Sequence, residues 1–374
     1  MEPRNVMLMT RTLGHGGTER QLTETALALD PAAFTPHVAC VESTGFRADE
    51  LRRRGIPILE LPITSLKDPR SLRALARFLR YMRQHSIRLL HSFDTSTNTF
   101  GIPLAKLPGG PVALSSQRCF ENVVWPPNRK LNRIAHRLAD GIVVNCEAVE
   151  RHLREDYGLP AEKIHVCRNG LDTSVFRPRE TGYEKPEALR DAELVIGSVS
   201  VLRAVKSLPT LVSAFALIKD TRPGLKLAIV GSGPVREELE SQAREYGIAD
   251  RCVFHPATHD VAAWLRAIDV FVLPSISEAF SNSLMEAMAC GCAAVASNVG
   301  GNPELVRHGE TGLLFTPGDA QDLARQLTVM VSSEEQRNRM AETGSAWVAK
   351  NLSREAAAQC METIYRQYLN EPRR

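Results

Sequence analysis

The sequence lacks several features that define common classes of protein. No stretch of roughly 18 apolar residues occurs, so no membrane-spanning helix is expected. The start, Glu2–Thr10, lacks a charged segment followed by a long apolar one, so no signal peptide is expected. None of the eight cysteines forms a C-x-x-C pair, and Cys290-Gly-Cys292 has no second pair or nearby histidine, which argues against a zinc site. We therefore expect free thiols in a reducing cytoplasm.

The chain also lacks a strong excess of one charge. Its 374 residues carry 46 Lys and Arg against 43 Asp and Glu, which is too even to predict a nucleic-acid partner. The charge is unevenly distributed, because residues 1–180 hold 26 basic and 19 acidic side chains while the remainder holds 20 and 24. The N-terminal half is therefore the better candidate for contact with an anionic surface.

One segment of that half, Lys67–Arg88, is rich in arginine and has the apolar spacing of an amphipathic helix. Such a helix can lie on an anionic membrane surface, which would make the protein peripheral at the inner face of the membrane. The commoner outcome is a helix that packs its apolar stripe on a sheet and leaves its arginines in water. We favour that second interpretation and keep the first as an alternative.

Short apolar runs alternate with amphipathic stretches along the whole chain, which predicts parallel sheets covered by helices. The polar segment Phe176–Asp191 interrupts this alternation and has the composition of a linker. The fold class expected is therefore α/β, with two Rossmann-like, doubly wound parallel-sheet domains over residues 1–178 and 190–353. A last helix, residues 354–370, follows no further strand and is expected to pack back on the first domain. The predicted strands include 6–9, 37–41, 88–91, 112–115, 141–144, 164–167, 195–199, 226–230, 252–255, 270–273 and 293–296.

A glycine-rich segment, Gly14–Arg20, follows the first predicted strand and opens a helix. Glycines let a ligand approach the backbone, and the first N–H groups of a helix attract anions. The dinucleotide fingerprint needs a third glycine where this chain has Glu19, which disfavours a nicotinamide oxidoreductase. A turn that serves only chain geometry is the alternative.

The segment Pro274–Glu286 follows the apolar run Val270–Leu273. In open α/β sheets, ligands bind beyond the carboxyl ends of the strands. The polar residues Ser281, Asn282 and Ser283 can cap the next helix, whose N–H groups then favour a phosphate. Glu278 and Glu286 would repel a phosphate, so we expect them to contact neutral sugar hydroxyls.

Two further residues follow predicted strands. Lys206 lies just after the run Val195–Val199, where an ammonium group can neutralise a diphosphate. His91 ends another strand, with Asp94 three residues later, and can orient or deprotonate a hydroxyl. An ordinary surface lysine and a packing histidine are the alternatives.

Five segments in register give the whole chain a resemblance to family 4 of the retaining glycosyltransferases, which have the GT-B fold. GHGGTER resembles the family's first glycine-rich loop, and residues 143–178 resemble its passage between domains. LAIVGSGPVREELE, DVFVLPSISEAFSNSLMEAMACG and VGGNPELVRHGETGLLF resemble its donor domain. The resemblance implies transfer of a sugar from a UDP- or GDP-sugar to a glycan, lipid-linked or small-molecule acceptor in an interdomain cleft, as in polysaccharide or glycolipid biosynthesis. It implies no cofactor, and the absence of an Asp-x-Asp pair fits a reaction without a metal ion.

The resemblance also implies roles for individual residues. Glu286 would bind the ribose, Glu278 would act on the transferred sugar, and His91 would be a second catalytic group. The rest of the donor site would consist of side chains or backbone amides near the diphosphate and one residue beside the base. Three further residues would contact the acceptor. The donor contacts are Gly16, Gly17, Arg203, Lys206, Ser281, Asn282, Ser283, Leu284 and Pro256, and the acceptor contacts are His15, Asp94 and Arg118.

The chain departs from the family pattern at three positions. Val201 stands where an arginine is common, Phe93 replaces a second histidine, and Ala279 replaces a glycine. Loss of a charge-assisted hydrogen bond to a diphosphate costs about 1.5–3 kcal/mol. Two alternatives therefore stay open beside the transferase: a catalytically impaired binding protein, and a nucleotide-sugar epimerase on the same fold.

Overall fold

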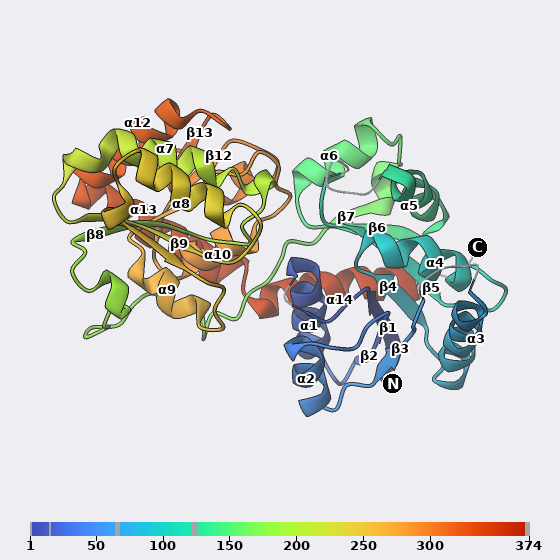
Figure 1. Ribbon diagram of the computed structural model, residues 1–374. Helices are drawn as coiled ribbons and strands as arrows, with labels where there is room; N and C mark the ends of the chain where they lie inside the picture. The colour runs from blue at the N-terminus through green and yellow to red at the C-terminus, as the bar shows by residue number, and fades with distance from the viewer. Residues whose placement is uncertain (1, 15, 64–67, 121–125, 371–374) are drawn as a thin grey trace. The chain divides into compact units, whose positions relative to one another are not determined.

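The computed structural model describes residues 2–14, 16–63, 68–120 and 126–370, and it forms two compact domains (Figure 1). The N-terminal domain runs to Gly170 and resumes at Arg354, and the C-terminal domain is Leu171–Ser353. The chain therefore passes from one domain to the other after Gly170 and again after Ser353. The predicted linker packs on the C-terminal domain, where Arg266 donates to the carbonyl oxygens of Val175 and Arg177 at 2.6 and 3.2 Å.

A seven-stranded parallel sheet forms the centre of the N-terminal domain. The first strand of the chain is third in this order. The next two strands are added on one side of it, and the chain then crosses over to add the remaining four on its other side. This reversal places the ends of β1 and β4 side by side. The strands, in spatial order, are β3 (Ile58–Glu60), β2 (Phe34–Cys40), β1 (Arg4–Thr10), β4 (Leu89–Ser92), β5 (Val112–Gln117), β6 (Gly141–Val144) and β7 (Ile164–Val166).

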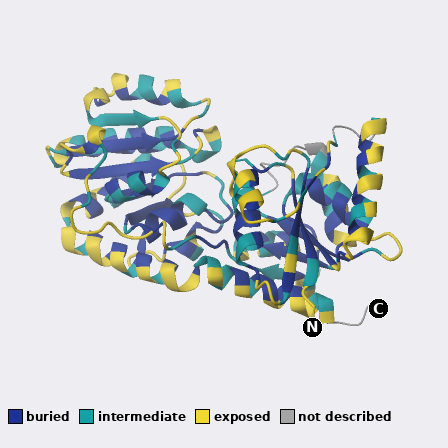
Figure 2. Cartoon of the chain, turned by 90° about the horizontal axis from the view of Figure 1, so that it is seen from below, coloured by how far each residue is buried: buried dark blue, intermediate teal, exposed yellow. Residues whose placement is uncertain are grey.

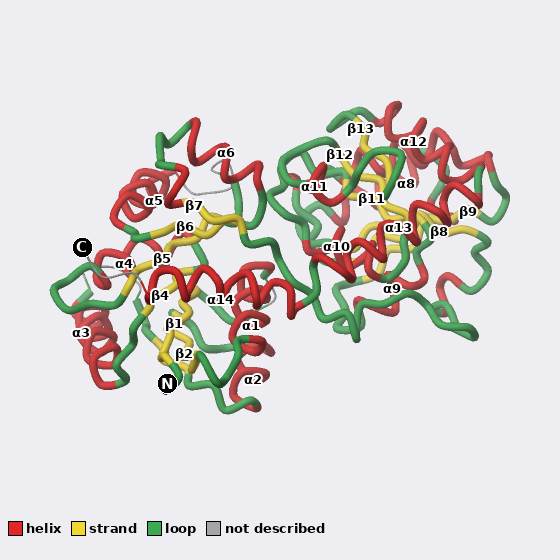
Figure 3. The backbone as a smooth tube through the Cα atoms, turned by 180° about the vertical axis from the view of Figure 1, so that it is seen from behind, coloured by secondary structure: helices red, strands yellow, loops and turns green. Residues whose placement is uncertain are grey.

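Helices cover both faces of this sheet. Helices α1, α2 and α14 share one apolar core with it, and α14 lies beside α1 (Figure 3). Helices α3, α4 and α5 share the core on the opposite face. The N-terminal domain has helices α1 (Gly17–Ala28), α2 (Phe46–Arg53), α3 (Pro69–Gln84), α4 (Thr95–Ala105), α5 (Pro126–Leu138), α6 (Glu147–Glu155) and α14 (Arg354–Asn370).

A six-stranded parallel sheet forms the centre of the C-terminal domain. Its first strand, β8, again lies inside the sheet, and the order in which strands are added reverses between β8 and β11. The strands, in spatial order, are β10 (Cys252–His255), β9 (Leu225–Val230), β8 (Leu194–Val199), β11 (Val270–Leu273), β12 (Ala293–Ser297) and β13 (Gly312–Phe315). The helices are α7 (Leu208–Ile218), α8 (Arg236–Glu245), α9 (Val261–Ala267), α10 (Asn282–Ala289), α11 (Asn302–Leu305), α12 (Ala320–Ser332) and α13 (Glu334–Asn351).

The burial of the strands explains why their sequences are so uniformly apolar. Every residue of β8, β11 and β12 is buried, because helices cover both faces of the sheet. Figure 2 shows most of the strand residues in dark blue and many exposed residues on the outer sides of helices and in loops. Among the described residues, no helix is both long and apolar enough to cross a bilayer.

The predicted fold class is confirmed, since both domains are parallel α/β sheets. All eleven predicted strands match an observed strand within three residues at each end. The strands β3 and β13 were not predicted. The predicted terminal helix is α14, whose Met361, Ile364 and Tyr365 lie in the core of the N-terminal domain.

Candidate functional site

The candidate donor site lies where the strand order of the C-terminal sheet reverses. The loop after β8 and the loop after β11 leave adjacent strands at this point. A backbone hydrogen bond joins them, from Ile276 N to Val205 O at 3.0 Å. Ligands of doubly wound sheets bind at such a reversal. The strand order therefore brings together two segments that lie about 70 residues apart in the sequence.

Lys206 and Glu278 form an ion pair across these two loops. Lys206 Nζ lies 2.5 Å from Glu278 Oε2, and Ser275 Oγ donates to the same oxygen at 3.1 Å. The two side chains are 20% and 16% exposed, so the pair is shielded but reachable. The next residue, Ser207, has a left-handed backbone with φ 48°, which is uncommon outside glycine and marks a constrained turn.

Helix α10 starts beside this pair. Its N-cap is Ser281, whose hydroxyl accepts a hydrogen bond from Leu284 N at 3.4 Å. The predicted cap is therefore confirmed, and the helix begins at Asn282. Glu286 lies in the second turn and is only 5% exposed. A helix N-terminus carries a partial positive charge, so the N–H groups near Ser281 and Ser283 favour an anion.

The other predicted donor contacts of this domain are exposed. The side chains of Arg203 and Pro256 both face solvent, and Val201 is 53% exposed. Pro256 follows β10 at the edge of the sheet, and Ala257 N beside it donates to Ser232 Oγ at 3.0 Å. The loop after β10 is thus tied to the turn after β9.

That turn needs its glycines. Gly231 has φ 150°, and a Cβ there would lie 1.9 Å from Ser200 O. Gly233 has φ 158°, and a Cβ there would lie 2.2 Å from Leu202 O. Only glycine allows the turn to pack so closely on the loop that leads to Lys206.

Gly16 and Gly17 start α1 in the N-terminal domain, as predicted, while His15 lies outside the described residues. The side chain of Glu19 folds back over Gly16, so that a Cβ there would meet its Oε2 at 2.0 Å. Glu19 Oε1 also accepts a hydrogen bond from Thr12 Oγ1 at 2.7 Å. The chain's own carboxylate therefore occupies the space beside Gly16.

His91 is fully buried, and both of its ring nitrogens have internal partners. Nδ1 lies 2.7 Å from Tyr365 Oη, and Nε2 lies 2.8 Å from Ser116 Oγ. Burial lowers the pKa of His91 well below its usual value, with a smaller contribution from Arg118. Phe93 is also fully buried, with its ring centroid 4.2 Å from that of His91. This geometry favours the packing interpretation of His91 over the catalytic one.

Asp94 and Arg118, predicted acceptor contacts, both follow strands of the N-terminal sheet. Asp94 caps α4 by accepting from Thr97 N at 2.9 Å, and it also accepts from Arg11 N at 2.5 Å. Burial raises the pKa of Asp94, and these two hydrogen bonds oppose the rise. Arg118 donates to Asn169 Oδ1 at 2.9 Å and lies over the Phe93 ring, while its buried Nε has no hydrogen-bond partner.

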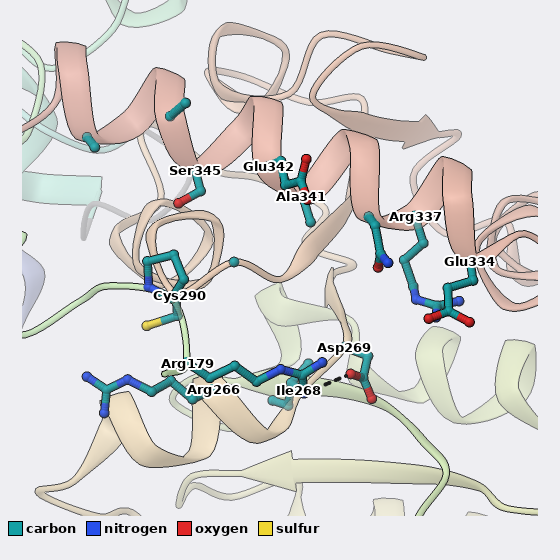
Figure 4. Close-up of a pocket in the computed structure, with 15 residues that line it drawn as sticks. Arg179, Arg266, Ile268, Asp269, Cys290, Glu334, Arg337, Ala341, Glu342 and Ser345 are labelled. Atoms are coloured by element: carbon teal, nitrogen blue, oxygen red, sulfur yellow. Dashed lines mark ion pairs between the residues drawn. The ribbon is translucent and has the colours of Figure 1, made fainter. Parts of the chain in front are cut away.

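A cavity of about 540 Å³ lies elsewhere in the C-terminal domain (Figure 4). Its lining includes Asp269 and Gly291, which precede β11 and β12, so it lies at the opposite end of these strands from Lys206. The arginines that line it already have partners: Arg179 pairs with Asp269 at 3.2 Å, Arg337 donates to Met330 O, and Arg266 donates to the two carbonyl oxygens named above. The cavity contains none of the predicted site residues.

Three residues that contact the predicted site were missed by sequence reasoning. Ser275 shares Glu278 with Lys206, Tyr365 bonds to His91, and Asn169 bonds to Arg118. Ser275 follows the strand in the same segment as Glu278, which was a usable signal. Tyr365 is 274 positions from His91, and nothing local links them.

Two family models match the chain in succession. The model described as Glycosyltransferase Family 4 matches residues 15–175, and the model described as Glycosyl transferases group 1 matches residues 181–347. The chain therefore belongs to glycosyltransferase family 4.

The chain is similar to two curated relatives with different names. It is 34% identical over 246 residues to the D-inositol 3-phosphate glycosyltransferase of Thermomonospora curvata, covering 61% of this chain and 57% of that protein. It is 32% identical over 213 residues to the N-acetyl-alpha-D-glucosaminyl L-malate synthase of Bacillus anthracis, covering 57% and 56%. The chain thus spans somewhat more than half the length of these relatives.

Solved structures match the fold over nearly the whole chain. Anabaena HepE in complex with UDP has a TM-score of 0.85 at 21% identity, covering 97% of this chain and 100% of that one. A glycosyltransferase from Rickettsia africae has a TM-score of 0.85 at 20% identity, covering 100% of both chains. At this level of identity the match establishes the shared fold.

Proposed function

We propose that this protein is a glycosyltransferase that moves a sugar from a nucleoside-diphosphate sugar to an acceptor, with retention of anomeric configuration and without a metal ion. The observation that carries the proposal is the convergence of Lys206, Glu278 and the start of α10 where the sheet reverses. Membership of glycosyltransferase family 4 and the UDP complex of a protein with the same fold support it.

The site's charges suit departure of a nucleoside diphosphate. Negative charge develops on the leaving diphosphate as the bond to the sugar breaks, and preorganised donors at that point lower the barrier. The ammonium group of Lys206 and the first N–H groups of α10 are such donors. Glu278 then contacts hydroxyls of the transferred sugar, and Glu286 those of the ribose.

The remaining predicted roles complete the proposal. Gly16, Gly17 and Arg203 assist the diphosphate, Pro256 borders the base, and His15, Asp94 and Arg118 contact the acceptor. The base is uracil or guanine, and the acceptor is a glycan, a lipid-linked glycan or a small molecule of polysaccharide or glycolipid synthesis. His91 is left out, because its ring nitrogens are engaged inside the domain.

We further propose a cytoplasmic protein with peripheral membrane contact through residues 67–88. All eight cysteines are free in the structure, as a reducing compartment would keep them. Lys67 lies outside the described residues. Helix α3 packs Phe78 and Met82 on the sheet and leaves its arginines exposed, as the favoured interpretation predicts. Those exposed arginines are the groups that an anionic membrane surface would contact.

A thermal-shift screen of UDP-, GDP- and ADP-sugars tests the donor, since a ligand that binds the native state raises its stability. We expect one nucleotide to stabilise wild type and to stabilise Lys206→Ala and Glu286→Gln less. Lys226→Ala is the matched control, because Lys226 is 19% exposed and ion-paired with Asp191 in the same domain. Release of the nucleoside diphosphate in the presence of acceptor then measures transfer.

Three outcomes would favour other functions. Conversion of the free nucleotide sugar without acceptor would favour an epimerase. Binding without any release of nucleoside diphosphate would favour an impaired binding protein, for which the exposed Val201 and buried Phe93 are the relevant departures. Stabilisation by a nicotinamide cofactor alone would favour an oxidoreductase.

A further inference from the structure

The three helices that cover one face of the N-terminal sheet contain no carboxylate. Helices α3, α4 and α5 share the apolar core on that face, and their sequences lack Asp and Glu altogether. Residues 69–138 contain twelve Lys and Arg but only two acids, Asp94 and Glu121. Asp94 is occupied in capping α4. The outer surface of these helices is therefore positive, although Lys106, just after α4, pairs with Asp140 at 2.7 Å.

Helix α3 supplies most of the exposed charge. Phe78 and Met82 anchor the helix on the sheet, and its arginines point away from that core. The single nearby acid, Asp68, accepts the hydrogen bond of Arg70 N as the N-cap. Within the part of the chain that the structure describes, no ion pair involves the exposed arginine side chains of α3. The exposed arginines are Arg70, Arg73, Arg77, Arg80 and Arg83.

Helix α5 adds an apolar stripe on the same side of the domain. Leu131, Ile134 and Leu138 are 52%, 51% and 43% exposed, and their spacing of three and four places them on one helix face. The opposite face holds Ala135 and His136, which are buried against the sheet. Single exposed leucines are ordinary, but three in a row on one face mark an interaction surface.

Other exposed residues on or next to these three helices are basic or apolar. Lys130 and Arg137 are exposed on α5 itself. Leu72 on α3 and Leu107 just after α4 are 57% and 44% exposed. A nucleic acid would engage the cations but leave the leucines in water, whereas a bilayer surface of anionic lipid accepts both.

We propose that the outer surface of α3 and α5 is a docking surface for an anionic phospholipid bilayer. The stripe of α5 enters the boundary between headgroups and acyl chains, and the arginines of α3 lie over the anionic headgroups. This extends to α5 the membrane contact proposed above for residues 67–88, and it does not depend on the chemistry of the donor site. Neither element suffices alone, because the stripe is short and the charges are screened by salt.

Sedimentation of the full chain with vesicles tests this surface. The vesicles are phosphatidylcholine alone or phosphatidylcholine mixed with phosphatidylglycerol, at low and at physiological ionic strength. One variant combines Arg73→Gln, Arg77→Gln and Arg80→Gln, and a second combines Leu131→Asn and Ile134→Asn. These side chains are exposed, so the fold should survive, which circular dichroism verifies.

Matched controls come from exposed residues of the C-terminal domain. Leu217→Asn removes a leucine that is 62% exposed on α7. A triple variant, Arg244→Gln, Arg325→Gln and Arg339→Gln, removes the same charge from exposed positions. Binding of UDP, measured by calorimetry on every variant, reports separately on the proposed catalytic function.

Wild type should sediment with the mixed vesicles and not with phosphatidylcholine alone. The α3 variant should bind the mixed vesicles more weakly than wild type, by about fivefold at low salt for each arginine removed. The effect should become smaller as the salt concentration rises. The α5 variant should lose about tenfold at either salt concentration, and both controls should bind as wild type. UDP binding should be unchanged throughout.

Several results would overturn the proposal. Failure of wild type to sediment with anionic vesicles is one such result, and binding of the α5 variant as tight as that of wild type is another. Conversion of a wild-type dimer to a monomer by the α5 variant, without lipid binding, would assign the stripe to self-association. Tight binding of a nucleic acid that only the α3 variant weakens would assign the charge to that partner.

Discussion

Lys206 Nζ lies 2.5 Å from Glu278 Oε2, so the cation proposed to hold the diphosphate is already paired with the carboxylate proposed to hold the sugar. A diphosphate must share or take over this ammonium group when it binds. Lys206 should therefore raise the affinity for a nucleoside diphosphate and Glu278 should lower it, although the two side chains are in contact. Substitution of each one should separate charge compensation from recognition of the sugar.

Glu278→Gln should raise the affinity for UDP or GDP, because it removes a negative charge beside the diphosphate. It should lower sugar transfer, because an amide is a weaker acceptor for sugar hydroxyls. Lys206→Met should lower affinity for the nucleoside diphosphate by about 10- to 100-fold, which is the size expected for a charge-assisted hydrogen bond. Calorimetry and a nucleoside-diphosphate release assay measure the two effects. Equal loss of nucleotide affinity in both variants would contradict the assignment.

Val201→Arg should strengthen binding of the nucleoside diphosphate by up to about tenfold, through one added charge-assisted contact. Val201 is 53% exposed on the loop that leads to Lys206, so a longer side chain has room. Val329→Arg, at an exposed position on α12, is the control for added charge alone. If both variants gain the same affinity, a general electrostatic effect accounts for the result.

Ser281→Ala should lower the free energy of unfolding by about 1 kcal/mol, because it removes the N-cap of α10. It should also weaken nucleotide binding, since the same helix start faces the proposed diphosphate. Ser333→Ala removes the equivalent cap of α13, where Ser333 accepts from Gln336 N at 3.2 Å. That control should lose similar stability in urea unfolding while nucleotide affinity stays unchanged. A Ser281 variant with full affinity would remove α10 from the binding site.

The stability of the protein should fall as pH drops below about 6.5. Burial lowers the pKa of His136 to about 3 in the folded state. In the unfolded state this histidine binds a proton with a pKa near 6.5, so acidification favours unfolding. Stability from this group is complete above pH 6.5 and is lost on acidification toward pH 3. The loss between pH 7 and pH 5 is about 2 kcal/mol for this histidine.

Urea unfolding at pH 7 and pH 5 measures this dependence. His136→Gln should be less stable than wild type at pH 7, since Ser115 and Asn132 lose a partner at 2.8 and 3.0 Å. It should nevertheless lose about 2 kcal/mol less on acidification. The exposed His259→Gln is the control and should follow wild type. An unchanged pH dependence in the His136 variant would show that other groups cause it.

Local patterns were enough to predict the two parallel sheets and the cap of α10. Apolar runs such as Val270–Leu273 are strands because only a doubly covered sheet buries every residue of such a run. Ser281 caps α10 because a short hydroxyl before an apolar helix satisfies its first N–H groups. The strands β3 and β13 were missed, since β3 has only three residues and β13 has only three apolar residues after a glycine.

Other features depend on which elements pack together, and no local pattern encodes that. Lys206 meets Glu278 only because β8 and β11 are neighbours, although two strands lie between them in the sequence. His91 is engaged by Tyr365 of a helix 274 positions away, which turns a candidate base into a packing residue. The apolar stripe of α5 is an exposed surface because its other face rests on the sheet. The chain's own chemistry defined the strands, caps and charges, whereas long-range packing chose their partners and the faces left in water.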